Sequence, residues 1–326
     1  MASFSQFGND LYTGKRSFDF IGKRRIWYSI AISLIILFVG VTLMRGGFQF
    51  GIEFRGGSQF EVADVANPDD ALASDVVASV VDKANAKVTI VGGDSVRVQT
   101  DQLTNRESDD VRDALAEAYG VGVSDVTASF IGPVWGQDIT NSSIRALLVF
   151  LGLAAVVMAL YFRTWKMSLA AMIALLHDLV ITAGIYGVLA FEVTPAAMIG
   201  FLTILGYSLY DTVVVFDKIR ENTTEDTGVR TFSESVNLAV NQTLVRSINT
   251  SVVALLPVAS ILFIGSVLLG AGTLRDIALA LFIGMLVGTY STIFIAAPLY
   301  AHLRQNEPEL RKQEQRLTEN RKASIA

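Results

Sequence analysis

Ionisable side chains inside apolar stretches are the residues of this sequence best placed to do chemistry. The run 167–191 contains His177 and Asp178, and the run 196–216 contains Asp211. A charge at the centre of a membrane helix costs about 2.5 to 3.5 kcal/mol on insertion scales, so such residues mark candidate functional sites. A carboxyl group that gains and loses a proton there could carry a proton or cation across the membrane. Asp211 is therefore the first candidate for an ion relay.

Asp211 has polar neighbours on its own predicted helix and a cation near the start of the next one. Tyr207 and Ser208 lie about one turn before Asp211. Arg246 stands just before the apolar run 248–269, and a long arginine side chain can turn inward from a helix end. We therefore expect Arg246 to contact Asp211, and we assign this pair to an ion relay. The alternative is a static polar contact that fixes helix packing.

A second group of polar residues could take part in the same relay. It comprises Asp178, His177, Ser208 and Asn249, the last of which follows Arg246 on the same helical face. For Asp178 and His177 the alternative is again a fixed hydrogen bond or ion pair between helices. We expect Asn249 to extend a polar seam from Arg246.

Metal, cofactor and enzyme chemistry find little support in the sequence. The chain has no cysteine and only 2 histidines, so a zinc site would have to be built almost entirely from carboxylates. No Gly-rich phosphate loop appears, and the segment 92–94 (Gly-Gly-Asp) is typical of a hairpin turn. An intramembrane hydrolase would have only Ser208 with His177 as nucleophile and base, without the motif that such enzymes show. We expect no catalytic residue, no cofactor and no metal site.

Six apolar runs must position the candidate residues. Hydrophobic residues make up 52% of the chain and charged residues 17%, against about 25% charged in ordinary soluble domains. A helix needs about 20 apolar residues to cross the hydrocarbon core of a bilayer. The runs cover 26–44, 144–162, 167–191, 196–216, 248–269 and 277–299. So little polar surface cannot cover six buried helices, and we predict six transmembrane helices.

The positions of lysine and arginine predict which ends of the membrane helices face the cytoplasm. Cytoplasmic loops carry an excess of these residues. They cluster before the first run, between the second and third, between the fourth and fifth, and after the sixth. We therefore predict that both termini are cytoplasmic. We also expect the first run to remain as an anchor, because no small-residue cleavage site follows it.

The segment between the first two runs has the composition of a soluble domain. Alternation predicts strands over 58–65, 87–91, 95–100 and 123–130, and helix signals open at 67–70 and 108–110. This β-α-β-β-α-β order is that of a ferredoxin-like fold. About sixteen acidic residues against six basic ones favour a solvated surface and oppose nucleic-acid binding. The alternative is a surface that avoids anionic lipid and holds extended chains only weakly.

We thus expect a polytopic α-helical membrane protein with an extracytoplasmic ferredoxin-like α+β domain between its first two helices. Gly284 and Gly288 in the last helix have the GxxxG spacing that permits close helix approach. The expected parts are a cytoplasmic segment (1–25), a first transmembrane helix (26–45), the outer domain (46–140), a five-helix transmembrane bundle (144–299) and a charged cytoplasmic tail (300–326).

Three segments of the chain resemble one family of membrane proteins. Phe50-Gly51-Ile52-Glu53-Phe54-Arg55-Gly56-Gly57 follows the first run, 206–222 surrounds Asp211, and 241–251 surrounds Arg246. Together with the six runs, they resemble the SecD/SecF family of protein-export subunits, in its SecF form, within the resistance-nodulation-division superfamily. The motif residues are Gly51, Glu53, Gly56, Gly57, Gly206 and Tyr207. The family usually has Asp where this chain has Glu53, and Asn where it has Tyr210.

The resemblance implies a function in protein export across the bacterial inner membrane. A SecF-like chain would use the proton (or sodium) gradient, with a SecD-like subunit, to promote polypeptide translocation. The implied partners are this SecD-like subunit, the SecYEG translocon, YajC, the exported polypeptide and membrane lipid. The resemblance also implies that Asp211 and Arg246 form the ion-coupled relay. The alternative is an ion-driven lipid or small-molecule exporter of the same superfamily, which would carry two repeats and two large outer domains.

Overall fold

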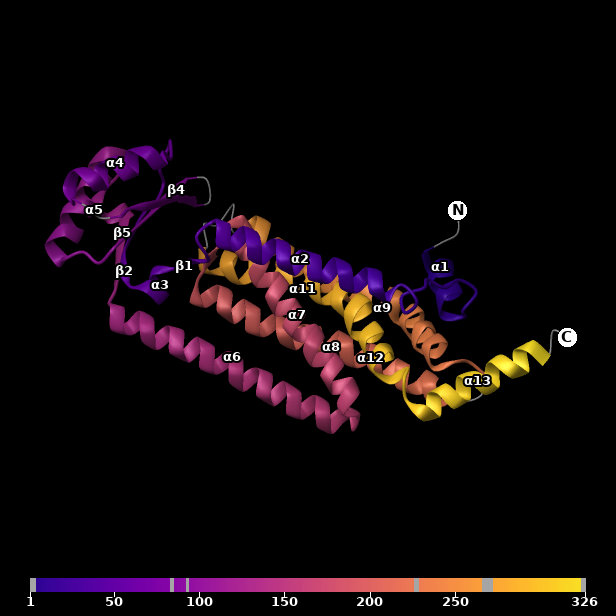
Figure 1. The fold of residues 1–326 in the computed structure, drawn as a ribbon. Coiled ribbons are helices and arrows are strands. Elements are labelled where there is room, and N and C mark those ends of the chain that lie inside the picture. Colours follow the sequence, from indigo (N-terminus) through magenta and orange to yellow (C-terminus); the bar gives the residue numbers. More distant parts are fainter. Residues whose placement is uncertain (1–3, 83–84, 92–93, 226–228, 266–271, 324–326) are drawn as a thin grey trace.

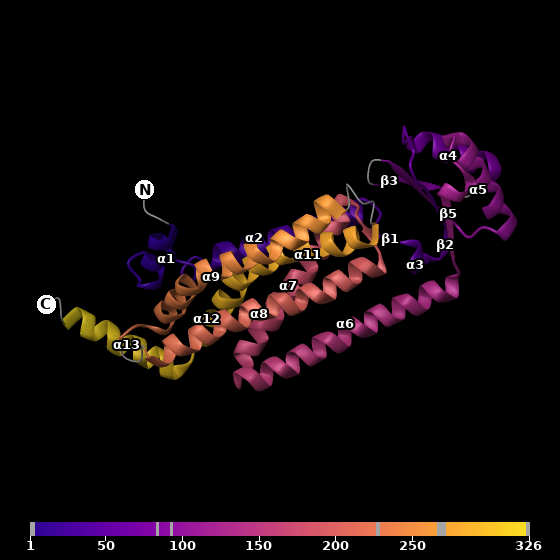
Figure 2. The same cartoon turned by 180° about the vertical axis from the view of Figure 1, so that it is seen from behind.

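A long helical bundle carries a small α/β domain at one end (Figure 1). The computed structural model describes residues 4–82, 85–91, 94–225, 229–265 and 272–323. The first and last helices, α1 (Phe4–Tyr12) and α13 (Pro308–Ala323), both lie at the end of the bundle opposite the α/β domain, as the view from behind also shows (Figure 2). Two sequence predictions fall outside the described residues, namely the turn at 92–93 and the end of the fifth apolar run at Leu269.

Six helices among the described residues are long and apolar enough to cross a membrane, as predicted. They are α2 (Arg24–Met44), α6 (Pro133–Phe162), α7 (Trp165–Leu189), α8 (Pro195–Glu225), α9 (Phe232–Ser260) with a π-helical end (Ile261–Gly265), and α11 (Gly272–Ser291), which continues through a π-helical turn (Thr292–Ala296) into α12 (Ala297–Arg304). Helices α6 and α8 extend well beyond their apolar runs. The polar ends of these two helices therefore reach past the apolar part of the bundle.

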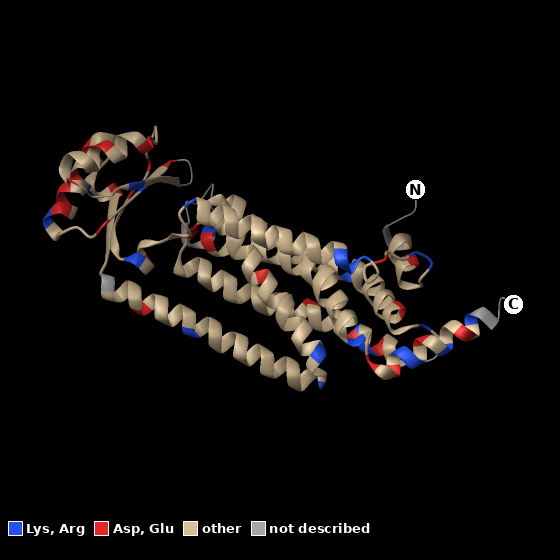
Figure 3. Cartoon of the chain, viewed as in Figure 1, with Lys and Arg blue, Asp and Glu red and all other residues tan. Residues whose placement is uncertain are grey.

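Three of the six helices form the interior of the bundle. The apolar windows of α7, α8 and α11–α12 are 56%, 50% and 50% buried, against 11%, 11% and 17% for α2, α6 and α9. The outer helices expose large apolar side chains, such as Ile36 on α2 and Leu153 on α6. Charged residues are sparse in the middle of the bundle and gather at its ends and on the α/β domain (Figure 3). This distribution suits a bundle surrounded by hydrocarbon.

Helices α8 and α11 approach closely at two glycines. A Cβ at Gly288 would lie 3.1 Å from the Cβ of Ser208, and a Cβ at Gly284 would overlap the side chain of Ile204. Small residues with this spacing allow two backbones to come together in a membrane. The predicted GxxxG pair therefore sets the packing of α11 against the face of α8 that carries Ser208.

The α/β domain follows the predicted β-α-β-β-α-β order. Its elements are β2 (Gly57–Val62), α4 (Asp70–Val80), β3 (Lys87–Val91), β4 (Ser95–Thr100), α5 (Asn105–Tyr119) and β5 (Val126–Ile131). The strands lie in the order β3-β4-β2-β5, and every pairing is antiparallel. Phe60, Val98 and Leu115 are fully buried in its core. This is the topology of the predicted ferredoxin-like fold.

Strand β2 covers Gly57–Val62 in place of the predicted 58–65, and two further elements begin three residues away from the prediction. Helix α5 starts at Asn105, ahead of the expected 108–110, because Thr104 and Glu107 form a capping box. Strand β5 starts at Val126, because the segment Val123–Asp125 forms a 3₁₀ turn (η1). In both cases local hydrogen bonding, rather than the apolar pattern, sets the boundary.

A short parallel pairing joins the outer domain to the bundle. Strand β1 (Gln49–Phe50) follows α2, and β6 (Glu192–Val193) lies in the turn between α7 and α8. Gln49 is opposite Glu192, and Phe50 is opposite Val193. The short helix α3 (Ile52–Arg55) then leads from β1 to β2. The domain is thus held to the bundle by backbone pairing in addition to its covalent connections.

Candidate functional site

Asp211 lies on the inner face of α8, inside the bundle, where it is 7% exposed. Its Oδ1 accepts a hydrogen bond of 2.8 Å from Ser247 Oγ on α9. Its Oδ2 is buried and has no hydrogen-bond partner among the described residues. A buried polar atom without a partner is unfavourable. This oxygen therefore remains able to accept a further hydrogen bond.

The predicted contact between Arg246 and Asp211 is not made. Arg246 is exposed on α9 and reaches Asp211 only by longer-range electrostatic attraction, with no ion pair between these two described side chains. Consecutive residues of a helix point about 100° apart, and Ser247 occupies the face of α9 that meets α8. Asn249 is exposed like Arg246. The seam predicted from these two residues is therefore on the surface of the bundle.

A second buried carboxylate lies on α7. Asp178 is 1% exposed, and its Oδ2 accepts a hydrogen bond of 2.5 Å from Ser208 Oγ on α8. Its Oδ1 lies 3.2 Å from Nδ1 of His177. The structure thus brings together the three secondary candidates Asp178, His177 and Ser208. Both oxygens of Asp178 have a partner, whereas Asp211 has a partner at one oxygen only.

Hydroxyl groups link the helices around the two carboxylates. Ser208 and Asp211 are three residues apart and share one face of α8. On the next residue of α8, Thr212 Oγ1 lies 3.0 Å from Thr292 Oγ1. Ser251 Oγ on α9 lies 2.6 Å from Thr289 Oγ1 on α11. The interior between α8, α9 and α11 is therefore polar along several turns.

Four of these hydroxyl residues were missed by the sequence analysis: Ser247, Ser251, Thr289 and Thr292. The four-residue spacing of Ser247 and Ser251 places both on one face of α9, and this spacing was the available signal. Thr289 and Thr292 follow the GxxxG segment that brings α11 against α8. In the part of the chain that the structure describes, no three His, Asp or Glu side chains gather to hold a metal ion.

The other residues of the middle motif lie near the site without bonding to Asp211. Tyr207 is partly buried and packs against an apolar cluster that includes Ile204 and Val258. Gly206 is exposed. Tyr210, where the family usually has Asn, points outward with 55% of its surface exposed. The departure from the family pattern at this position therefore falls on the surface of the bundle.

The glycine motif shapes the entry to the outer domain. Gly51 precedes α3 as its N-cap residue. Gly56 and Gly57 have φ angles of +77° and +139°, which favour glycine. A Cβ at Gly57 would overlap the carbonyl oxygen of Thr100 on β4. These glycines allow β2 to lie beside β4, while Glu53 turns toward a polar pocket between the domain and the bundle.

Two protein families match the two regions described above, the carboxylates of the bundle and the glycine motif. The family described as "Protein export membrane protein SecD/SecF, C-terminal" matches residues 110–306. The family described as "SecD/SecF GG Motif" matches residues 45–63. The first match contains Asp178, Asp211 and the hydroxyl groups around them, and the second contains the glycine motif.

Individual relatives agree with these matches. The protein translocase subunit SecF of Streptomyces coelicolor is 42% identical over 328 residues, covering 100% of this chain and 87% of the relative. The protein translocase subunit SecF of Mycobacterium tuberculosis is 40% identical over 332 residues, covering 97% of this chain and 73% of the relative.

A solved structure has the same fold. The crystal structure of SecDF from Thermus thermophilus matches with a TM-score of 0.75 at 30% identity, over 89% of this chain and 39% of that one. This chain therefore spans about two fifths of the SecDF protein. The resemblance predicted from three motifs is confirmed by family, relatives and fold: the chain belongs to the SecD/SecF family of protein export membrane proteins.

Proposed function

We propose that this SecF-like subunit of the Sec protein-export machinery uses the proton (or sodium) gradient to promote polypeptide translocation. The observation that carries the proposal is the state of Asp211: it is buried, Ser247 donates a hydrogen bond to one oxygen, and the other oxygen has no partner among the residues that the structure describes. Such a carboxyl group can take up a proton when the helices expose it to one side and release it to the other. One charge crossing 100 mV releases about 2.3 kcal/mol, enough to bias the position of the outer domain.

In this proposal Asp178, His177 and Ser208 form a second station of the relay. The Ser208 hydroxyl can donate and accept hydrogen bonds, and it shares a face of α8 with Asp211. A shift of α8 against α7 would break the bond between Ser208 and Asp178. The same shift would change the bond between Asp211 and Ser247. Movement of one helix would thus alter the partners of both carboxylates.

The exposed face of α9 is the proposed contact for a SecD-like subunit. Arg246 and Asn249 are exposed on this helix among Ile248, Val252 and Val253. Polar and charged groups are unfavourable against hydrocarbon, and a polar face of a partner helix would satisfy them. The match covers only 39% of the SecDF chain, and the remainder of SecDF is a model for the kind of segment that could lie against this face. Arg246 would then take part in the relay together with that partner.

The remaining assignments are extensions of the same proposal. The subunit would have no catalytic activity of its own and would act beside SecYEG and YajC, in contact with membrane lipid and the exported polypeptide. It would lie in the bacterial inner membrane with both termini cytoplasmic. The positions of α1 and α13 at the same end of the bundle support termini on one side of the membrane, and the lysine and arginine clusters favour the cytoplasmic side.

The proposed function is tested by reconstituting export. Inverted membrane vesicles would contain the translocon and its ATPase, with or without this chain and a SecD-like subunit. We expect the pair to stimulate export of a secreted reporter in energised vesicles, and an uncoupler to remove the stimulation. Stimulation that is unchanged by the uncoupler would contradict gradient coupling.

A further inference from the structure

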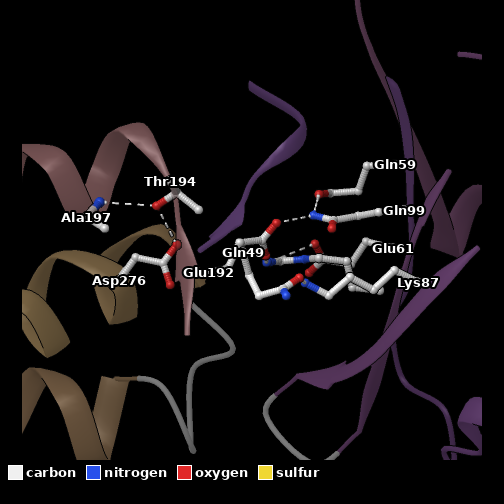
Figure 4. Close-up of polar contacts among 10 residues, drawn as sticks. Gln49, Gln59, Glu61, Lys87, Gln99, Glu192, Thr194, Ala197 and Asp276 are labelled. Carbon is white, nitrogen blue, oxygen red and sulfur yellow. Dashed lines mark hydrogen bonds and ion pairs between the residues drawn. The ribbon is translucent and has the colours of Figure 1, made fainter. Parts of the chain in front are cut away.

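A polar junction lies between the outer domain and the outer ends of the bundle helices (Figure 4). It surrounds a cavity of about 420 Å³, lined by residues of the outer domain, of α3, of the turn that contains β6, and of α11. The backbone pairing of β1 with β6 lies at the same place. Glu53 of the first motif belongs to this junction, but neither the backbone role of the motif's glycines nor the proposed relay accounts for the junction's side chains.

Glu192 on β6 is the residue that the outer domain holds. Gln99 Nε2 on β4 donates a hydrogen bond of 2.6 Å to Glu192 Oε1. Arg97, on the same strand, forms two ion pairs. Its Nη1 lies 4.0 Å from Glu192 Oε2, and its Nη2 lies 3.4 Å from Glu61 Oε2 on β2. Beside them, Lys87 Nζ on β3 donates to Gln49 Oε1 on β1 at 3.2 Å. Three strands, β2, β3 and β4, thus contribute side chains to this contact.

Hydrogen bonds also attach the segment that carries Glu192, between α7 and α8, to the bundle (Figure 4). Thr194 Oγ1 donates a hydrogen bond of 2.8 Å to Asp276 Oδ2 on α11. The same hydroxyl accepts a hydrogen bond of 3.1 Å from the backbone N–H of Ala197 on α8. The contact at Glu192 therefore connects the outer domain to α8 and α11, and α8 is the helix that carries Asp211.

The charges of the junction do not balance. Four carboxylates line the cavity, on Glu53, Glu61, Glu192 and Asp276, and the only cation among its described lining residues is Arg97. Lys87 is bound to Gln49 at the edge. Oε2 of Glu53 is buried and has no hydrogen-bond partner within the described ranges.

A negative charge on Glu53 of α3 is unfavourable in this junction, because the side chain is buried near other carboxylates. Burial raises the pKa of Glu53, and the carboxylates of Glu192 and Asp276 raise it further, whereas its own backbone and Arg97 lower it. A carboxyl group with a raised pKa in the docked arrangement binds more protons there than in an open one. Docking is then strongest below the ordinary carboxyl pKa, and it weakens as the pH rises through the raised value.

We propose that this junction is a proton-sensitive latch, in which Arg97 and Gln99 hold Glu192 and protonation of Glu53 tightens the docking of the outer domain on the bundle. When Glu53 is deprotonated, repulsion from Glu192 and Asp276 loosens the contact. An acidified outer compartment thus favours the docked domain. The latch responds to protons at the outer surface, whereas the proposed relay responds to protons inside the bundle, so the two can operate separately.

The test uses the full chain, which has no native cysteine. Cysteines at Ala78 on α4 and Leu189 on α7, both exposed, would carry spin labels in lipid nanodiscs without an ion gradient. The distance distribution between the labels is measured by pulsed electron paramagnetic resonance at pH 5 and pH 9. We expect one narrow distribution at pH 5 and a broader one with a longer component at pH 9.

Matched variants identify the groups responsible. Glu53→Gln is neutral at every pH, and we expect it to keep the narrow distribution at pH 9. Glu117→Gln removes an exposed carboxylate of α5 outside the junction and should retain the full pH response. Arg97→Gln should broaden the distribution at both pH values, because the cation that holds Glu192 is lost.

Three results would overturn the latch. They are a wild-type distribution that does not change between the two pH values, a Glu53→Gln variant that still follows the pH, and an Arg97→Gln variant that stays narrow at both. The measurement needs neither a gradient nor export, so a failed relay would leave its outcome unchanged.

Discussion

Asp211 and Asp178 differ in how completely their carboxylates are hydrogen-bonded. Within the described part of the chain, Asp178 has Ser208 at one oxygen and His177 at the other, whereas Asp211 has Ser247 at one oxygen only. A carboxylate with hydrogen bonds at both oxygens is held more firmly than one with a bond at a single oxygen, and the second kind can gain more by a change of partner. The hydrogen bonding thus gives a physical reason to rank Asp211 above Asp178 as a relay residue.

The first prediction concerns the hydroxyl that holds Asp211. Ser247→Ala removes the hydrogen bond to Oδ1, and a bond to a charged group contributes about 1.5–3 kcal/mol. We expect the gradient-dependent part of export to fall about tenfold or more, while Ser247→Thr retains most of it. Ser251→Ala, which loses a contact to Thr289 instead, serves as control in the same vesicle assay. Equal effects of the two alanine variants would show that the bond to Asp211 has no special role.

The second prediction concerns the charge of Arg246. Within this chain the guanidinium attracts Asp211 at longer range and does not bind its carboxylate. Charge should therefore matter more than the planar shape of the group. We expect Arg246→Lys to keep most of the uncoupler-sensitive export and Arg246→Gln to lose most of it, with equal amounts of protein in the membrane. A lysine variant as defective as the glutamine variant would show that a partner uses the planar fork.

For single residues, the sequence predicted which side chains are buried better than it predicted which side of a helix points into the bundle. Asp178, Ser208 and Asp211 are buried polar residues inside apolar runs, and each was a candidate before the fold was known. The error on α9 arose because Arg246 and Ser247 are neighbours that point about 100° apart. Which of the two residues faces α8 depends on the packing of three helices. The prediction chose Arg246 because of its charge, and Arg246 lies on the outward face.

At the scale of elements, alternating apolar residues and turn signals were the reliable guides. Strands β3 and β4 coincide with the predicted 87–91 and 95–100. The ends of α6 and α8 were predicted poorly, because an apolar run marks only the part of a helix that suits the membrane, and a helix that has begun can continue into polar residues. The pairing of β1 with β6 was not predicted at all. It joins two two-residue segments far apart in sequence, and such segments carry no periodic signal.

The third prediction tests the glycine motif as a structural element. In Gly57→Ala a Cβ would meet the carbonyl of Thr100, and the positive φ angle adds strain of roughly 1–3 kcal/mol. We expect a fragment of residues 48–136 to unfold cooperatively, and this substitution to lower its free energy of unfolding by at least the strain. Ser129→Ala at an exposed position of β5 is the control, with an effect within about 0.5 kcal/mol. Equal stability of the two variants in urea would contradict the account of the motif.

At the scale of the whole molecule, helix α8 connects two groups of carboxylates, one inside the bundle and one at the junction with the outer domain. The carboxylates of the bundle lie on α7 and α8, and the junction at Glu192 is fixed to α8 and α11. A shift of α8 would therefore act on both regions. The outer domain contacts this junction through Arg97 and Gln99.

The fourth prediction concerns orientation in the membrane. Cysteines at Glu117 on α5 and Glu225 at the end of α8 would each be the only cysteine of the chain, and both positions are exposed. We expect an impermeant maleimide to label Glu117→Cys in intact cells and to label Glu225→Cys only after the membrane is opened. Labelling of the Glu225→Cys protein from outside would reverse the proposed orientation.

The central claim is that Asp211 couples the gradient to export, and one substitution tests it most directly. Asp211→Asn is nearly isosteric and neutral, so the protein should insert into the membrane and bind a SecD-like subunit normally. The amide cannot release a proton, and we predict that the variant loses the uncoupler-sensitive stimulation of reporter export in energised inverted vesicles, normalised to subunit abundance. Asp178→Asn, whose amide oxygen can still accept from Ser208, should lose less. Normal uncoupler-sensitive stimulation by the Asp211→Asn protein would contradict the account.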